Sequence, residues 1–125
     1  MGANGIETDI QRSKDGILVL HHDTSLKRTA GVEQNVCDLT ISELQQLDFG
    51  SFKSSKYKNE RIVLLQDFLY YLGGKDLTFA FEIKQAGVEH DALMLIRKYV
   101  PEERFTVTSF MLESVLTLAK EEKKF

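Results

Sequence analysis

The sequence predicts an α/β fold in which a parallel sheet is covered by helices. The second half of the chain alternates between strand and helix patterns, with strands expected at 77–84 and 105–110 and helices at 88–100 and 112–123. An earlier apolar strand pattern begins near residue 6. Such alternation favours parallel strands joined by helices. Three strands are too few for a closed barrel, so we expect a segment of a larger fold.

The first strand carries two carboxylates on one face. In the sequence IETDI at 6–10, strand alternation separates Glu7 and Asp9 from the flanking isoleucines. The sequence KDG at 14–16 predicts a hairpin-like reversal, because Gly16 can adopt a positive φ. The apolar run 17–22 then returns as a second strand, so this stretch predicts a hairpin.

Between the hairpin and the strand at 77–84 we expect two helices joined by loops. Residues 23–37 and 49–61 have the composition of loops. A T-x-x-E capping box predicts a short helix over 40–48. Leucines at helical spacing predict another over 62–72, and the adjacent glycines 73 and 74 end it.

Four charged side chains are candidates for a site. Glu7 and Asp9 have the chemistry of oxygen ligands for a metal, although an ordinary solvent-facing pair on an edge strand is the alternative. Glu82 and Lys84 share one face at the end of an apolar strand. They could form a simple ion pair there, or supply a metal carboxylate and a cation for a phosphate oxygen.

Two adjacent histidines end the second strand. Only one of His21 and His22 can face inward, and strand alternation alone does not decide which. The alternative is a polar strand end that reaches water. His90 lies among acidic residues at the start of a helix and is expected on the surface, and Cys37 has no activating neighbour that would indicate catalysis.

Composition and charge exclude some partners. The chain has 125 residues, a formal net charge of -3 and one cysteine. This charge does not favour binding to nucleic acid or to an anionic membrane surface. No apolar run reaches transmembrane length and no signal peptide is visible. A single cysteine is compatible with a reducing compartment, so we expect a cytoplasmic protein.

The order of these motifs resembles the glycerophosphodiester phosphodiesterase family. That family's pattern is similar to G-A-[DN]-x-I-E-x-D-[VI]-x-x-[ST]-K-D-G-x-x-V-x-x-H-D-x-x-L-x-R-T, which matches residues 2–29. Arg61-Ile62, the sequence FEIK at 81–84 and Ser109-Phe110 resemble later landmarks. The resemblance therefore covers nearly the whole chain, and we treat residues 1–125 as one partial domain of this family.

The resemblance implies a TIM barrel with its site at the carboxyl ends of the strands. It implies that Glu7, Asp9 and Glu82 bind a divalent cation, Ca²⁺ or Mg²⁺, and that these carboxylates converge with His22 on the same side. His22 matches the catalytic histidine. His21 matches a variable position and is expected to face away from the metal, where its loss would act only through packing. Lys84 matches a lysine near the phosphate. The implied substrate is a small glycerophosphodiester, and the products are glycerol 3-phosphate and an alcohol.

One departure from the family pattern changes the expectation for this chain. The family's first histidine lies in an H-R-G motif followed by P-E-N-T, and neither occurs here. We therefore expect an internal or truncated piece, about half of the barrel, that is inactive alone and self-associates through open sheet edges. The alternatives are a related barrel phosphodiesterase of phospholipase D-like type and a non-catalytic module that retains the fold.

Overall fold

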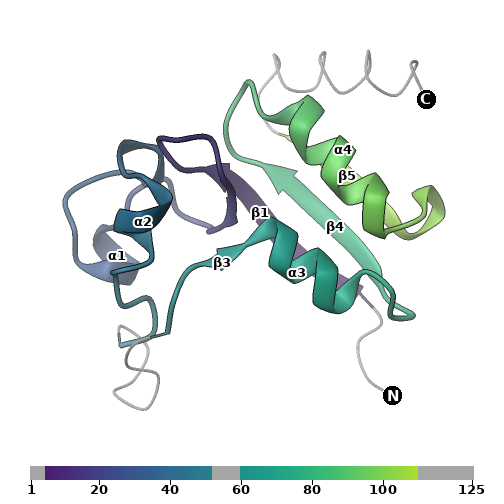
Figure 1. Ribbon diagram of the computed structural model, residues 1–125, viewed down its shortest axis with the longest axis horizontal. Coiled ribbons are helices and arrows are strands. Elements are labelled where there is room, and N and C mark those ends of the chain that lie inside the picture. The colour runs from purple at the N-terminus through teal and green to yellow at the C-terminus, as the bar shows by residue number, and fades with distance from the viewer. Residues whose placement is uncertain (1–4, 52–59, 110–125) are drawn as a thin grey trace.

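The computed structural model describes residues 5–51 and 60–109, which form a five-stranded mixed sheet with helices (Figure 1). The strands lie in the order β3-β2-β1-β4-β5. Their bounds are β1 Gly5–Arg12, β2 Leu18–Leu20, β3 Val63–Leu64, β4 Thr78–Ile83 and β5 Phe105–Thr108. β4 is parallel to β1 and β5, whereas β2 is antiparallel to β1 and β3. The three expected core strands are thus confirmed as the parallel part of the sheet.

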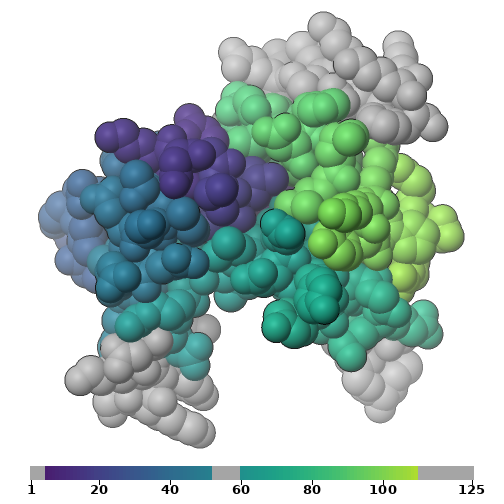
Figure 2. Space-filling model, in the orientation of Figure 1, coloured from purple at the N-terminus to yellow at the C-terminus, as the bar shows by residue number. Residues whose placement is uncertain are grey.

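Two of the helices cover one face of this sheet. The helical segments are α1 Lys27–Ala30, η1 Val36–Asp38, α2 Ile41–Leu44, α3 Leu65–Leu72, α4 Glu89–Tyr99 and η3 Glu102–Arg104. α3 and α4 run along β4, while the segment from β2 to α2 gathers at the other side of the molecule (Figures 1 and 2). Within the described residues, no helix combines the length and apolar character needed to cross a membrane.

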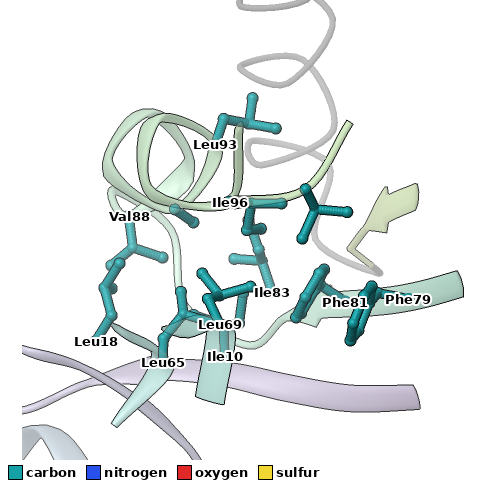
Figure 3. Close-up of a cluster of buried hydrophobic side chains, with 12 residues drawn as sticks. Ile10, Leu18, Leu65, Leu69, Phe79, Phe81, Ile83, Val88, Leu93 and Ile96 are labelled. Atoms are coloured by element: carbon teal, nitrogen blue, oxygen red, sulfur yellow. The ribbon is translucent and has the colours of Figure 1, made fainter. Parts of the chain in front are cut away.

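The main core lies between β4 and these two helices (Figure 3). Alternation along β4 buries Phe79, Phe81 and Ile83, as expected. They belong to one cluster with Leu69 of α3 and Ile96 of α4. Each such side chain contributes roughly 1.5–3 kcal/mol when fully buried, so the face of the sheet that meets the helices is strongly specified.

A second cluster packs beneath the short helices. Its buried residues are Val19, Leu26, Val36, Leu39, Leu44 and Ile62. The expected capping box of α2 is confirmed, because Thr40 Oγ1 accepts from the Glu43 amide at 3.3 Å and Glu43 Oε1 accepts from the Thr40 amide at 3.0 Å. The expected turn is also confirmed, with Gly16 at a φ of 88°.

Several expected bounds are wrong. The helix expected over 62–72 begins at Leu65, because the two preceding residues pair with β2 as the edge strand β3. The loop expected at 23–37 contains α1 and η1. α2 ends at Leu44 rather than 48, where the Asp48 carboxylate instead accepts hydrogen bonds from the amides of Gly50 and Ser51. The strand expected at 17–22 spans only Leu18–Leu20. The helix expected at 112–123 lies outside the described residues.

The two glycines after α3 provide a matched test of this packing. A Cβ at Gly73 would lie 2.6 Å from the Leu69 carbonyl oxygen and 2.9 Å from the Tyr99 Cβ, whereas a Cβ at Gly74 would meet nothing within 4 Å. We predict that Gly73→Ala lowers the free energy of unfolding by about 1–3 kcal/mol. Gly74→Ala should change it by less than about 0.5 kcal/mol. Urea denaturation of both variants measures this, and equal effects would contradict the packing of α3 against α4.

Candidate active site

The register between β1 and β4 places two carboxylates side by side. Asp9 is the partner of Glu82, and Ile10 is the partner of Ile83. Side chains of paired residues in adjacent strands project to the same face. Because Ile10 and Ile83 are buried in the main core, Asp9 and Glu82 lie on the face opposite the helices. Glu7 lies on that face too, two residues earlier, as the partner of Ala80.

These side chains line a hollow of about 620 Å³ on the face of the sheet away from α3 and α4. Its lining residues are Glu7, Thr8, Asp9, His22, Ala80, Phe81, Glu82 and Thr108. The structure therefore brings Glu7, Asp9, Glu82 and His22 around one space, although their roles stay predictions. Thr108, the register partner of Glu82 in β5, was not anticipated from the sequence.

Lys84 provides the positive charge beside the carboxylates. Its Nζ lies 2.6 Å from Glu82 Oε2 and 3.7 Å from Asp9 Oδ1, and its side chain is only 14% exposed. The Lys84 amide also donates to the Ile10 carbonyl at 3.0 Å, which fixes the backbone just after β4. The Glu82–Lys84 ion pair, one of the two alternatives left open by the sequence, is thus present, and it extends to Asp9.

The two carboxyl groups have opposite shifts in pKa. Burial raises the pKa of Asp9 above its ordinary value, and the Lys84 ammonium opposes this effect. The hydrogen bond from Lys84 lowers the pKa of Glu82 and raises the pKa of Lys84. The interaction between the side chains of Asp9 and Glu82 acts in the same directions, raising the pKa of Asp9 and lowering that of Glu82. Their close approach is a concentration of negative charge that favours a cation.

His22 reaches the same hollow from the segment after β2. Its side chain is 71% exposed, and Nδ1 donates to Asp23 Oδ1 at 2.9 Å. Arg28 binds Asp23 through two hydrogen bonds, from Nε at 2.7 Å and from its terminal Nη2 at 2.9 Å. These bonds hold the pKa of the Asp23 carboxyl well below its usual range. With Nδ1 engaged by Asp23, Nε2 is the ring nitrogen available to a ligand.

His21 has a different environment. It is buried, with Nδ1 2.6 Å from the Asp23 carbonyl and Nε2 2.8 Å from Thr29 Oγ1, and it meets the Phe49 ring edge-on. Burial lowers the pKa of His21. Both histidines follow the end of β2 at Leu20, so strand alternation does not place them. Sequence reasoning gave Asp23 and Arg28 no role, although their D-x4-R spacing was available as a signal.

The donor chemistry fits a hard divalent cation, because carboxylate oxygens are its preferred ligands. Asp9 and Glu82 are register partners on neighbouring strands, and Glu7 lines the same hollow. Among the described residues, however, no three acidic, histidine or cysteine side chains are grouped as a ready metal site. In this structure the expected metal triad consists of the adjacent pair Asp9 and Glu82, with Glu7 nearby. Lys84 supplies a positive charge beside the pair.

A second hollow of the same size lies at the opposite ends of these strands. It is lined by residues that include Gly5, Thr78, Glu103 and Arg104, and it shares Glu7 and Ala80 with the first hollow. The Arg104 guanidinium donates to the backbone carbonyls of Gly73 and Lys75, which ties η3 to the turn after α3. The histidine and the carboxylate pair lie at the other hollow, which is therefore the candidate active site.

The chain resembles known phosphodiesterases along its length. Residues 1–123 match the model of the glycerophosphoryl diester phosphodiesterase family. A glycerophosphodiester phosphodiesterase from Caldanaerobacter subterraneus subsp. tengcongensis is 38% identical over 115 residues, which cover 88% of this chain and 47% of the relative. The chain thus spans about half the length of this curated relative.

Solved structures of phosphodiesterases also match this chain over about half of their own length. A glycerophosphodiester phosphodiesterase from Agrobacterium tumefaciens superposes with a TM-score of 0.89 at 28% identity, covering 99% of this chain and 53% of that one. An Oleispira antarctica phosphodiesterase, solved with the product sn-glycerol-3-phosphate, gives 0.82 at 28% identity and coverages of 96% and 51%. The open sheet of the described residues is accordingly part of a TIM barrel, as expected.

The Asp23–Arg28 pair can be tested by titration. Its stabilising effect is present above the ordinary carboxyl pKa of 3.8 and is lost as the pH falls through the lowered value. We predict that Arg28→Met raises the pKa of Asp23 toward 3.8, because the main cause of its depression is removed. Carbon-detected NMR titration of the carboxyl measures the change.

The neighbouring variant Lys27→Met is the matched control. Lys27 pairs with Glu33 at 3.3 Å, so its loss should leave the pKa of Asp23 unchanged. Equal titration of Asp23 in wild type and Arg28→Met would contradict the assigned pairing.

Proposed function

Because the chain belongs to the glycerophosphoryl diester phosphodiesterase family, we propose that it supplies half of a barrel that hydrolyses glycerophosphodiesters to glycerol 3-phosphate and an alcohol. The observation that carries this proposal is the hollow in which Asp9 and Glu82, from neighbouring strands, lie with His22. The related enzyme solved with sn-glycerol-3-phosphate supports the same substrate class.

The carboxylates would hold a divalent cation. Asp9 and Glu82 are the first ligands in this proposal, with Glu7 completing the set, and Ca²⁺ and Mg²⁺ both suit these oxygens. When bound, the cation supplies Lewis-acid polarisation of the phosphodiester. The Lys84 ammonium, 2.6 Å from Glu82, is placed to pair with a phosphate oxygen beside it. The carboxylates and Lys84 together bind and orient the phosphate.

His22 transfers the proton. Its Nε2 takes the proton of the attacking water or hydroxyl as the new P–O bond forms, or gives a proton to the leaving alcohol oxygen as its P–O bond breaks, while Nδ1–H stays bound to Asp23. Asp23 is itself held by Arg28, so the ring has one preferred tautomer and orientation. This arrangement of an oriented histidine next to a carboxylate pair supports a hydrolase over a module that only binds.

The chain alone lacks parts of this machinery in our proposal. A complete barrel of this type has roughly 250 residues. The chain contains no H-R-G sequence, so the second histidine implied by the family resemblance would come from outside it. In the described sheet, β3 and β5 lie at the edges, and open edges favour pairing with other strands, including those of a second copy.

Substitution of His22 in the full-length barrel tests the function. We predict that His22→Ala lowers kcat for glycerophosphocholine by on the order of 10²–10⁴-fold at saturating Mg²⁺ or Ca²⁺, because general acid–base catalysis is lost. His90→Ala is the control, since His90 is exposed on α4 and lies outside the hollow. Hydrolysis is followed by release of choline, and an unchanged kcat in His22→Ala would overturn the assignment.

A further inference from the structure

A buried side chain of β1 fixes the backbone on both sides of His22. Gln11 is 0% exposed, and its Nε2 donates to the His21 carbonyl at 2.7 Å and to the Asp23 carbonyl at 2.8 Å. One amide group thus uses both hydrogens to bind the residues that flank His22. The opposite orientation of the amide would place an oxygen against two carbonyl oxygens, so the hydrogen bonds determine it.

The His21 ring completes this arrangement. A carbonyl can only accept, so the 2.6 Å contact with Asp23 requires a hydrogen on His21 Nδ1. In the neutral ring, Nε2 then accepts from the Thr29 hydroxyl at 2.8 Å. Burial favours the neutral ring. The His21 amide donates to the Asp9 carbonyl at 3.1 Å, which ties the same segment to β1.

These contacts explain how an exposed ring can have a defined position. The His22 side chain is 71% exposed, so packing contributes little to its orientation. The residues on either side of it are held by the Gln11 side chain and by the His21 ring. The Gln11 bonds and the His21 amide connect this segment to β1, the strand that carries Asp9. The distance between the histidine and the carboxylates therefore depends on a buried hydrogen-bond network.

We propose that His21 is a positioning residue, which together with Gln11 fixes the backbone of His22 relative to the carboxylates of β1. This departs from the expectation that His21 contributes only through packing. The effect on catalysis rests on the proposed function, whereas the effect on the order of the His22 backbone does not.

Two substitutions of His21 separate hydrogen bonding from packing. His21→Asn keeps an N–H donor near the position of Nδ1 but fills the site poorly, whereas His21→Leu fills it better and has no donor. In the full-length barrel, we expect His21→Leu to lower kcat by about tenfold to 10²-fold with KM within about twofold. We expect His21→Asn to stay within about threefold of wild type. A packing role predicts the reverse order, and that result would overturn the proposal.

Backbone dynamics test the same point without enzyme activity. In the ¹⁵N-labelled 125-residue chain, we expect wild-type and His21→Asn order parameters at the His22 and Asp23 amides of about 0.85, as in a rigid backbone. In His21→Leu they should fall below about 0.6. Gln11→Met keeps the side-chain length but removes both donors, so it should lower the order parameters at the same amides. It serves as the test if His21→Leu does not fold.

Enzyme activity and backbone order parameters distinguish the positioning role of His21 from the proposed phosphodiesterase function. Order parameters that stay high in both His21→Leu and Gln11→Met would overturn the positioning role, whatever the activity. A wild-type barrel without phosphodiesterase activity would instead overturn the proposed function, while the order parameters would still decide the role of His21.

Discussion

The parallel pairing of β1 with β4 is the constraint on which the rest of the structure depends. Its register places Ile10 beside Ile83 on the face that meets the helices, and Asp9 beside Glu82 on the other face. A slip of one residue in either strand would move its carboxylates into the apolar core. Burial of the core side chains, at roughly 1.5–3 kcal/mol each, therefore maintains the geometry of the candidate site.

The charges on the open face are arranged around this pairing. Asp9 and Glu82 repel each other when both are ionised, and the Lys84 ammonium offsets the repulsion from its place just after β4. The Lys84 ammonium thus supplies, from the chain itself, the positive charge that the carboxylates require. A metal cation would be favoured in the same space. His22 lies in the segment after β2, outside the pairing of β1 with β4. Its position therefore depends on the hydrogen bonds of Gln11.

Much of this could be predicted from particular residues. Alternation in IETDI and TFAFEI gave the strands and their faces, and the T-x-x-E motif gave the start of α2. β3 was missed because Val63 and Leu64 continue into the leucines of α3, and two residues of strand cannot be separated from a helical pattern. The position of His22 depends on hydrogen bonds between distant residues, which no local pattern contains.

The most direct test of this account is the location of a bound metal ion. Mn²⁺ added to the ¹⁵N-labelled chain should broaden the amide signals around Asp9 and Glu82 first, because the two carboxylates share one hollow. Glu82→Gln should weaken this broadening, since it removes an anionic ligand. Broadening centred instead on Glu103, at the opposite hollow, or broadening that is unchanged in Glu82→Gln, would contradict it.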